Sequence, residues 1–376
     1  MQKLQNELSQ TWDKKEYSGI ILITGWIWYI WSHAVVAFEK AWYKTVLIDN
    51  LINSSLNTLN WIEKILWYKP DFFELDLREK DKLEEVFKKY DFDWVIHFAW
   101  LKAVWESCKK PLEYYDNNIV WSLKLFEVME KFWVKNIIFS SSATVYEQTP
   151  PSIPPIIKGG KSMESGLKEN NLTWNTTNPY GTTKFILEQM LKDLANFSWF
   201  KVMNLRYFNP IWAHKSGLIW ENPTWIPNNL LPYIMKVATK ELDEVKVFWD
   251  DYDTIDGTWV RDYIDVVDLI DWHLKAYDKI INPSLTIPLI LMEGNKNVWF
   301  FEVYNLGTGK WTSVLEMINI SEKVTWKKIN YKIVWRREWD LASVFCNPKK
   351  AERELGWKAV VSLEESIKNT WKFYSK

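Results

Sequence analysis

Tyr180 and Lys184 are the residues whose types and spacing most directly suggest proton transfer. They stand four residues apart in Tyr180-Gly181-Thr182-Thr183-Lys184, and this spacing places a phenol and an ammonium group on one face of a helix. A phenol with a pKa near 10 is a poor base at neutral pH, and each unit of lowering requires about 1.4 kcal/mol of charge stabilisation. A nearby ammonium group can supply part of it, which makes Tyr180 a candidate general base. An exposed surface pair is the alternative, because Y-x-x-x-K is frequent by chance.

Residues 20–33 predict an apolar strand, a tight turn at Gly25 and the start of a helix. Trp28 and Trp31 follow Gly25 by three and six residues, and glycine at both places would give the phosphate loop G-x-x-G-x-x-G. Such a loop needs residues without side chains, because the turn is tight and a pyrophosphate contacts its backbone. Asp49 stands 24 residues after Gly25, where an acid accepts adenosine ribose hydroxyls and repels a 2′-phosphate. Together these features predict NAD in preference to NADP.

A serine cluster, Ser140-Ser141-Ser142, follows another apolar run that predicts a strand. Serine clusters usually form the turn that ends a strand, so this one is weak evidence by itself. Its position in series with the phosphate loop and with Y-x-x-x-K makes the combination specific.

The elements that must position these residues alternate between strand and helix patterns. Strands are predicted at residues 20–24, 45–49, 94–99, 136–140 and 201–207. Helical segments include residues 77–90, 115–132 and 180–197. The alternation predicts an α/β fold with a Rossmann-like, doubly wound parallel sheet. A smaller C-terminal lobe should follow, ending in a helix capped by Ser362 and Glu365.

The length of the chain predicts either two domains or one large domain with a lobe. We expect an N-terminal arm at residues 1–18, a nucleotide-binding domain at 19–208, and a mainly substrate-binding lobe at 209–376 that is partly interleaved with it. The segment 147–177 is rich in proline and is expected to be either a solvated surface loop or a lid over the substrate. The segment around 282–299 is expected to be a loop or an added hairpin.

Composition excludes several classes of partner. The chain carries 47 basic and 48 acidic residues without a basic block, which gives no support for nucleic acid or an anionic membrane as partner and favours a small molecule. Cys108 and Cys346 form no disulfide framework, which fits a reducing compartment. The first 17 residues lack the apolar core of a signal peptide, so a cytoplasmic location is expected. The four histidines show no metal-ligand spacing, and no metal is expected.

From Gly19 almost to the C-terminus, the chain resembles the UDP-glucose (UDP-galactose) 4-epimerase family of extended short-chain dehydrogenases. The resemblance implies an NAD-dependent enzyme that inverts C4 of a UDP-hexose through a 4-keto intermediate. It implies that Tyr180 takes the proton of the 4-hydroxyl group, that Lys184 and the cationic nicotinamide lower the pKa of the phenol, and that Ser142 hydrogen-bonds the same hydroxyl. It also implies a homodimer formed through helices at about residues 115–132 and 180–197.

The same resemblance assigns residues to two binding sites. The cofactor site comprises Gly25, Trp28, Tyr29, Ile30, Trp31, Asp49, Asn50, Asn53, Ser54, Asp76, Leu77, Phe98, Ala99, Lys102, Asn117, Ser142, Tyr180, Lys184 and Phe208. The substrate site comprises Asn209, Asn229, Leu230, Val247, Phe248, Arg261, Arg337, Asp340 and Val344. Arginine suits a pyrophosphate because its guanidinium group binds oxygens in pairs. Val344 falls where bulk limits an N-acetyl group in this family, so UDP-N-acetylglucosamine is a candidate second substrate.

Tryptophan and glycine occur in unusual numbers. There are 27 tryptophans and 12 glycines, whereas ordinary usage of about 7% predicts roughly 26 glycines. The family pattern has glycine at Trp26, Trp28, Trp31, Trp42, Trp100, Trp105, Trp121, Trp212, Trp220, Trp225, Trp249, Trp259, Trp272, Trp311 and Trp339. Trp357 and Trp371, by contrast, match genuine tryptophans.

We hypothesise that the source organism decodes one codon, most plausibly the stop codon UGA, as glycine, and that tryptophan is written in its place. If the indoles are real, overpacking would cost about 1 to 3 kcal/mol at each of a dozen positions. The sum would exceed a stability of about 5 to 15 kcal/mol.

Two rival functions remain. A nucleotide-sugar 4,6-dehydratase shares the fold, NAD and Y-x-x-x-K, but it uses an Asp-Glu pair beside the serine or threonine. Here Ser142-Ala143-Thr144 supplies no carboxyl group, which disfavours dehydration. A non-catalytic nucleotide-binding or regulatory protein becomes the stronger interpretation if Trp28 and Trp31 are real, and failure to retain NAD would reveal it.

Overall fold

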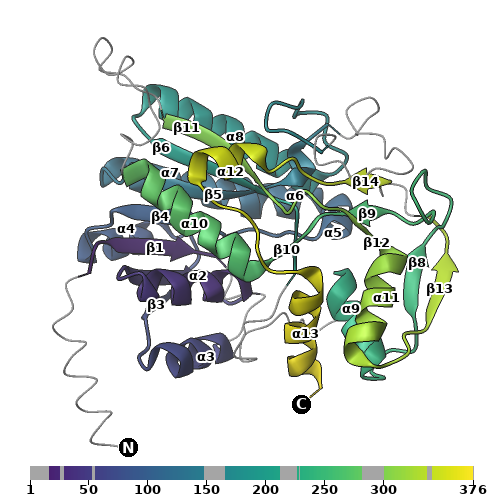
Figure 1. Ribbon diagram of the computed structural model, residues 1–376. Helices are drawn as coiled ribbons and strands as arrows, with labels where there is room; N and C mark the ends of the chain where they lie inside the picture. The colour runs from purple at the N-terminus through teal and green to yellow at the C-terminus, as the bar shows by residue number, and fades with distance from the viewer. Residues whose placement is uncertain are drawn as a thin grey trace, which may run out of the picture.

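The structure is a computed structural model that describes residues 17–25, 29–52, 56–147, 166–211, 227, 229–281, 300–336 and 341–375. A seven-stranded parallel sheet with strand order β11-β6-β5-β4-β1-β2-β3 forms its centre (Figure 1). The strands are β1 (Ile20–Thr24), β2 (Lys44–Asp49), β3 (Asp71–Glu74), β4 (Trp94–His97), β5 (Asn136–Ser142), β6 (Lys201–Tyr207) and β11 (Phe300–Leu306). The predicted α/β class and its parallel sheet are confirmed.

Helices cover both faces of the sheet because successive side chains of its strands point to opposite sides. Ile21 and Ile23 of β1 belong to the core beneath α2 (Tyr29–Lys40), α3 (Asn57–Leu66) and α10 (Val266–Ile281). Leu22 belongs to the core on the other face, beneath α4 (Lys80–Lys89), α7 (Trp121–Lys131) and α8 (Pro179–Phe197). This double burial explains why the apolar residues of β1 do not alternate with polar ones.

The helix predicted over residues 115–132 has a different local structure. The α-helix α7 is preceded by a π-helical turn at Asp116–Val120, which continues the short helix α6 (Pro111–Tyr115). Another short helix, α5 (Val104–Lys109), lies before it. Asn118 in the π-helical turn is fully buried; its Oδ1 accepts a hydrogen bond from Leu101 N at 2.8 Å, and its Nδ2 donates to Leu101 O and Thr183 Oγ1, each at 3.0 Å.

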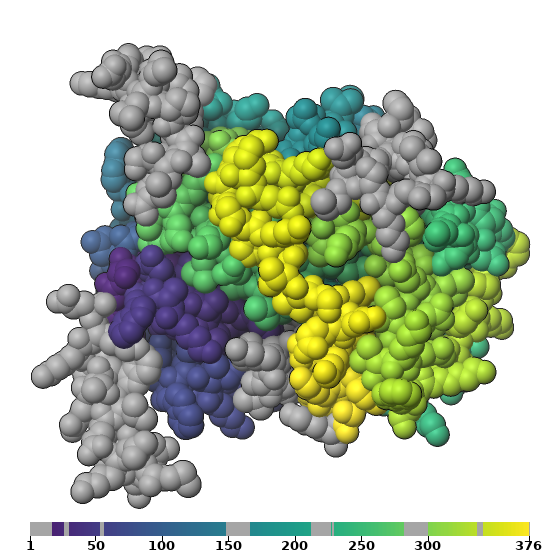
Figure 2. All heavy atoms as spheres, in the orientation of Figure 1, coloured from purple at the N-terminus to yellow at the C-terminus, as the bar shows by residue number. Residues whose placement is uncertain are grey.

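The remaining elements build a lobe beside the carboxyl ends of the sheet strands. Its helices are α9 (Leu230–Ala238), α11 (Val314–Thr325) and α13 (Leu363–Tyr374), whereas α12 (Lys349–Leu355) packs against β11 and α10 of the sheet domain. Its strands pair as β7 (Asn209–Ile211) with β10 (Tyr263–Asp265), β8 (Val245–Phe248) with β13 (Tyr331–Val334), and β9 (Val260–Arg261) with both β12 (Thr312–Ser313) and β14 (Ser343–Val344). The C-terminal residues, yellow in Figure 2, run from the sheet domain to the edge of this lobe. The predicted cap of the last helix is confirmed, since Ser362 Oγ accepts a hydrogen bond from Glu365 N at 3.2 Å.

Tryptophans end several helices in a left-handed backbone conformation. Of the eight non-glycine residues with positive φ in the described ranges, six are tryptophans: Trp42, Trp67, Trp133, Trp199, Trp249 and Trp326. Trp67 and Trp326 directly follow α3 and α11, the place where Gly356 follows α12. Glycine is the usual residue there, because a Cβ makes this conformation costly by roughly 1 to 2 kcal/mol.

Four of these six were not predicted to be glycine positions; only Trp42 and Trp249 were. The six left-handed tryptophans are therefore a separate observation from the family pattern.

None of the helices in the described ranges combines the length and hydrophobicity that a membrane crossing needs.

Candidate active site

The predicted catalytic residues come together where α8 packs on the end of β5. Asn178 begins α8, and its Oδ1 accepts a hydrogen bond from Gly181 N at 2.9 Å. Gly181 lets the helix approach the serine segment, because a Cβ there would lie 2.6 Å from Thr144 O. The helix thereby brings the Tyr180 phenol into a hydrogen bond with Ser142.

Lys184 lies one helical turn after Tyr180 and is fully buried. Its Nζ donates a hydrogen bond to Ser140 O at 2.7 Å and lies 5.9 Å from the centre of the Tyr180 ring. Ser142, Tyr180 and Lys184 therefore form one cluster, although they come from segments that are 38 or more residues apart. This is the arrangement that a tyrosine base with a neighbouring cation requires.

Burial shifts the pKa values of both groups toward their neutral forms. It raises the pKa of Tyr180 to about 12, and the hydrogen bond from Ser142 acts in the opposite direction. Burial also lowers the pKa of Lys184 well below its ordinary value, against the opposing effect of the Glu188 carboxylate. The expected lowering of the phenol pKa is thus not produced by these protein groups, because desolvation outweighs them.

Trp100 occupies the space beside the Lys184 ammonium group. The Nζ atom lies 2.6 Å from the centre of the indole ring, closer than the roughly 3.5 to 4 Å at which non-bonded atoms attract one another. The indole therefore crowds the Lys184 ammonium group. Trp100 is among the positions where the family pattern has glycine.

The cofactor edge of the sheet lies between β1, β2 and β4. Gly25 ends β1 with φ of 113° and packs against the backbone of Phe98 and Ala99 so closely that a Cβ would overlap it. Asp49 ends β2 and is buried, and its Oδ1 accepts a hydrogen bond from Leu51 N at 2.7 Å. The backbone thus has the strand, glycine turn and acidic strand end of a dinucleotide site.

A second group at this edge joins β2 to the segment after β3. Asn50 Nδ2 donates a hydrogen bond to Asp76 Oδ2 at 3.1 Å. Arg78 forms an ion pair with Asp76 at 2.8 Å. Burial raises the pKa of Asp76, but the bonds from Arg78 outweigh it and hold the pKa below its ordinary value. Asp76 is therefore ionised at neutral pH.

His97 has a structural environment. Its Nδ1 lies 2.6 Å from Thr24 Oγ1 and its Nε2 lies 2.8 Å from Ser122 Oγ. Burial, followed by the charge of Lys184, lowers its pKa well below the ordinary value. The ring is neutral and ties the end of β1 to α7. Within the described residues, no group of histidine, cysteine or acidic side chains has metal-binding geometry.

The substrate side is built from β9, β14 and the segment after β6. Val344 pairs with Arg261 across these two strands, and it packs against the cluster that contains Ala143 and Phe208. Arg261 Nη1 donates hydrogen bonds to Val260 O and Leu341 O, both at 2.8 Å. Ala143 follows Ser142 directly, so the structure brings Val344 to the neighbourhood of the serine cluster.

The chain has extensive similarity to known proteins. The family model described as GDP-mannose 4,6 dehydratase matches residues 22–370. The UDP-glucose 4-epimerase of Bacillus subtilis (strain 168) is 44% identical over 357 residues, covering 94% of this chain and 96% of that protein. The chain belongs to the UDP-glucose 4-epimerase family.

Solved structures support the same family. The UDP-glucose 4-epimerase of Bifidobacterium longum in complex with NAD+ and UDP has a TM-score of 0.83 at 42% identity, covering 95% of this chain and 98% of that chain. The enzyme from Stenotrophomonas maltophila with bound NAD and formylated UDP-arabinopyranose also has a TM-score of 0.83, at 38% identity over 95% of this chain and 98% of that chain.

The other cofactor residues expected from the epimerase family are distributed along the same edge. Ala99, Leu77, Phe98, Asn117 and Phe208 are buried, whereas Ile30 and Lys102 are partly exposed. Trp31 lies in the core at 1% exposure, and its Nε1 has no hydrogen-bond partner. Trp28, Asn53 and Ser54 lie outside the described residues, as does the side chain of Tyr29.

The other residues that the epimerase family leads us to expect at the substrate lie on several separate elements. Asn209 begins β7, and its backbone N donates a hydrogen bond to Asp262 O at 3.0 Å. Asn229 and Leu230 stand at the start of α9. Val247 is buried in the main core, whereas Phe248 is partly exposed. Arg337 and Asp340 lie outside the described residues.

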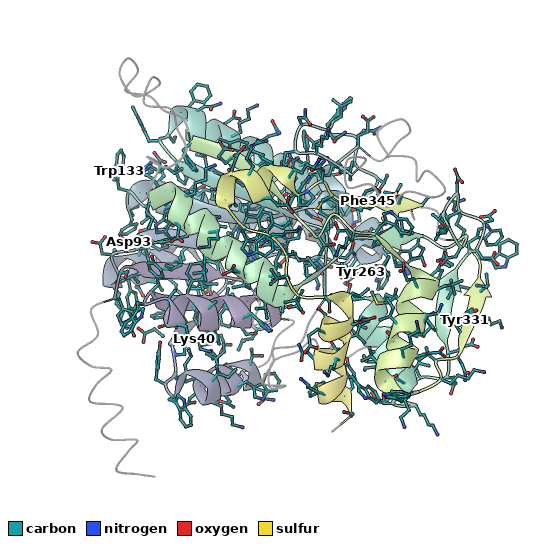
Figure 3. All side chains as sticks on the ribbon, viewed as in Figure 1. Lys40, Asp93, Trp133, Tyr263, Tyr331 and Phe345 are labelled. Atoms are coloured by element: carbon teal, nitrogen blue, oxygen red, sulfur yellow. The ribbon has the colours of Figure 1, made fainter. Side chains whose placement is uncertain are left out.

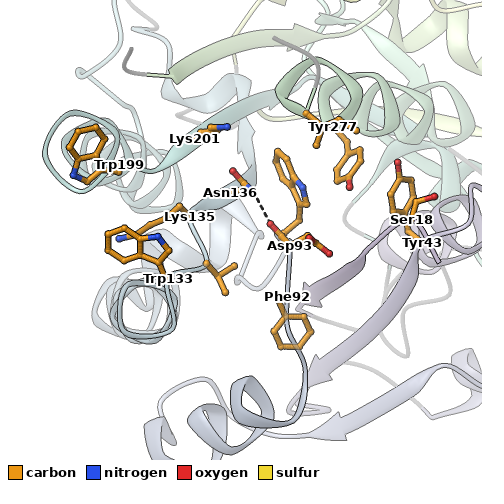
Figure 4. A pocket seen from close by; sticks show the side chains of 13 residues that line it. Ser18, Tyr43, Phe92, Asp93, Trp133, Lys135, Asn136, Trp199, Lys201 and Tyr277 are labelled. Carbon is orange, nitrogen blue, oxygen red and sulfur yellow. Dashed lines mark hydrogen bonds between the residues drawn. The ribbon is translucent and has the colours of Figure 1, made fainter. Parts of the chain in front are cut away.

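A cavity of about 670 Å³ lies at the opposite edge of the sheet (Figure 4). Its lining includes Asp93, Asn136 and Lys201, which stand where β4, β5 and β6 begin. Asn136 Nδ2 donates a hydrogen bond to Asp93 O at 2.9 Å. In Figure 3, Asp93 and Trp133 lie at this edge, away from Tyr263 and Phe345. The cavity is separate from the cluster of Ser142, Tyr180 and Lys184 at the carboxyl ends of the sheet strands.

The sequence prediction missed two charged residues beside the catalytic cluster. Glu188 and Arg206 form an ion pair of 2.6 Å with both side chains buried. The sequence position of Glu188 could have pointed to it, since Glu188 is four residues after Lys184 and so lies on the same helix face.

Proposed function

We propose that this chain is an NAD-dependent UDP-glucose 4-epimerase, with Tyr180 as the catalytic base. The observation that carries the proposal is the cluster of Ser142, Tyr180 and Lys184 at the carboxyl edge of the parallel sheet. Family membership across 94% of the chain supports it. The substrate is a UDP-hexose, UDP-glucose or UDP-galactose.

The described residues fit NAD. The backbone at Gly25 has no room for a Cβ, Asp49 ends the adjacent strand, and Trp31 points into the core rather than to the sheet edge. When bound, NAD supplies the group that accepts and returns the hydride of C4. Gly25, Asp49 and Ala99 would hold it, together with Asn50 and Asp76.

The chain supplies the proton chemistry. Tyr180 would take the proton of the sugar 4-hydroxyl while Ser142 hydrogen-bonds the same oxygen and the phenol. Because burial raises the pKa of the phenol, Lys184 would stabilise the phenolate only together with the positive charge that bound NAD supplies. After the 4-keto sugar rotates in the site, Tyr180 would return the proton to the sugar 4-oxygen, and the inversion at C4 would be complete.

A 4,6-dehydratase is disfavoured by the surroundings of the phenol. Among the described residues, the influences on the pKa of Tyr180 are burial and Ser142, with no carboxylate contributing. Ala143 and Thr144 stand where the dehydratases carry an Asp-Glu pair. Without an acid beside the sugar, water loss has no proton donor.

The activity is tested by incubating the full chain with UDP-galactose and measuring UDP-glucose, together with the NAD retained by the purified protein. Conversion that is lost in Tyr180→Phe supports the epimerase. A 6-deoxy-4-keto product would identify a dehydratase. If neither product forms and the purified protein retains no NAD, the non-catalytic nucleotide-binding alternative is favoured.

We further propose that the native protein has glycine at the tryptophan positions where the family pattern has glycine, through reassignment of one codon. Six tryptophans with positive φ and the contact of Trp100 with Lys184 support this. The test is peptide mass spectrometry on protein from the native source. The tryptic fragment 16–40 contains Trp26, Trp28 and Trp31, and tryptophan masses at all three would refute the proposal.

The oligomeric state and domain division are also proposals. A homodimer would form through α7 and α8, and Leu123, a large apolar side chain exposed on α7, supports a contact there. Light scattering during gel filtration tests the dimer, and a monomer mass would refute it.

We place the boundary between the two domains at residues 208 and 209, with β11 returning to the first sheet. A cytoplasmic location remains part of this proposal.

A further inference from the structure

Three residues of α8 form a stripe that faces the end of β5. Tyr180, Lys184 and Glu188 follow one another at intervals of four residues, so they share a helix face. Tyr180 meets Ser142, and Lys184 Nζ bonds Ser140 O. The third contact is made by Glu188, whose Oε1 accepts a hydrogen bond from Ser141 Oγ at 2.5 Å.

Glu188 is held in place from the neighbouring strand. Arg206 Nε donates to Glu188 Oε1 at 2.9 Å, and Nη2 donates to Oε2 at 2.6 Å. Arg206 stands on β6 directly opposite Ser141 on β5. The carboxylate therefore joins the helix to two adjacent strands at the level of the serine cluster.

Arg206 is itself fixed by a further shell of contacts. Its Nη1 donates a hydrogen bond to Glu169 O at 3.1 Å, and its guanidinium group lies 4.7 Å from the centre of the Tyr146 ring. Tyr146 OH donates to Asn305 Oδ1 at 2.6 Å. These bonds leave the ion pair little freedom to move.

Stability alone does not account for a buried ion pair, because desolvation of the two charges offsets their attraction. A pair of apolar side chains of similar volume would fill the same space. The directional bonds of Glu188 instead set how α8 lies along β5. A small displacement there would move the phenol away from Ser142.

We propose that Glu188 and Arg206 are a positioning pair that fixes the register of α8 on β5 and so holds the Tyr180 phenol against Ser142. The proposal deepens the epimerase assignment and, for its kinetic part, rests on it. The Glu188 charge also opposes the loss of charge at Lys184.

The test replaces both charges at once, since either single change leaves the other charge buried and unpaired. The variant is Glu188→Leu with Arg206→Met in the full chain. The matched control is Lys279→Met with Glu354→Leu, which removes the 3.2 Å ion pair between α10 and α12. Both variants are first compared with the parent by thermal unfolding.

The positioning pair predicts a loss of about 100-fold in kcat, as expected when a reacting group is misplaced by about 1 Å. The KM for UDP-galactose should stay close to that of the parent, because neither residue contacts the substrate. The control variant should keep both constants. A kcat equal to that of the control would overturn the proposal.

A second readout does not depend on turnover. In protein labelled with tyrosine carrying 13C at Cζ, the signal of Tyr180 is assigned by its loss in Tyr180→Phe. We expect the Glu188/Arg206 variant to move this signal toward its position in Ser142→Ala, while the control leaves it in place. An unmoved signal would overturn the positioning role. If the parent chain is inactive but the signal moves, the epimerase assignment fails and the positioning role stands.

Discussion

The ammonium group of Lys184 lies 2.6 Å from the centre of the Trp100 indole ring, inside the normal contact distance. Lys184 is also the residue expected to stabilise the phenolate of Tyr180. The indole therefore crowds the group on which the proton chemistry depends. A glycine at position 100 would leave room for the ammonium group and for a cofactor beside it.

The substitution Trp100→Gly should therefore improve cofactor binding rather than impair it. NAD binding would no longer have to displace the indole, an overpacking cost of about 1 to 3 kcal/mol, so NAD affinity should rise by roughly 5- to 150-fold. It can be measured by fluorescence titration with NAD. Trp357→Gly is the control, because Trp357 packs edge-on against Trp272 with ring centres 4.3 Å apart. That variant should lose about 3 to 5 kcal/mol of stability without tighter NAD binding. Weaker NAD binding in Trp100→Gly would count against the glycine assignment.

The left-handed tryptophans give a prediction about stability. Trp326 follows α11 with φ of 55° and is 91% exposed, so its side chain contributes little packing. Trp326→Gly should raise the free energy of unfolding by about 1 kcal/mol, since glycine adopts this conformation without a Cβ penalty. Urea denaturation measures the change. Trp174→Gly is the matched control, because Trp174 is also exposed but is not among the residues with positive φ. Equal effects of the two substitutions would contradict the backbone argument.

The sequence predicted the strands that are buried on both faces. It missed the strands whose place depends on pairing with a neighbouring strand. β1 and β6 begin and end where predicted: β1 is an apolar run closed by a threonine, and six of the seven residues of β6 are buried. β3 has half-exposed side chains at the edge of the sheet and gave little pattern. β11 joins β6 only because the chain returns to the sheet after residue 299. Such a return depends on tertiary contacts that no local pattern encodes.

The candidate site was predictable to a similar extent. The spacing of Tyr180 and Lys184 and the serine cluster pointed to residues that the structure brings together. Glu188 and Arg206 were missed because charged residues on a helix and a strand usually face solvent. The π-helical turn was also missed, since it accompanies bonds of the Asn118 side chain to Leu101. Both features arise from contacts between distant segments.

The buried phenol predicts how stability changes in alkali. Burial raises the pKa of Tyr180 to about 12 in the folded state, above about 10 in the unfolded chain. The unfolded chain therefore loses its proton first, so this contribution to stability is complete below pH 10 and is lost as the pH rises toward 12. At pH 11 the loss should be about 1.4 kcal/mol. Urea denaturation of the parent and Tyr180→Phe at pH 8 and pH 11 should show a smaller alkaline loss in the variant. An identical loss in both proteins would mean that the phenol titrates normally.

Val344 provides the prediction about the sugar. It pairs with Arg261 and packs beside Ala143 and Phe208, next to the serine cluster. A tyrosine at this position would fill the space where an acetamido group on the sugar would lie. Val344→Tyr should therefore suppress conversion of UDP-N-acetylglucosamine by roughly 5- to 150-fold, since a clash of about 1 to 3 kcal/mol is expected, and should spare UDP-galactose. Steady-state kinetics with the two substrates measure the ratio of their kcat/KM values. Because a general distortion of the site would slow both reactions, equal losses on the two sugars would place Val344 outside the specificity-determining contacts.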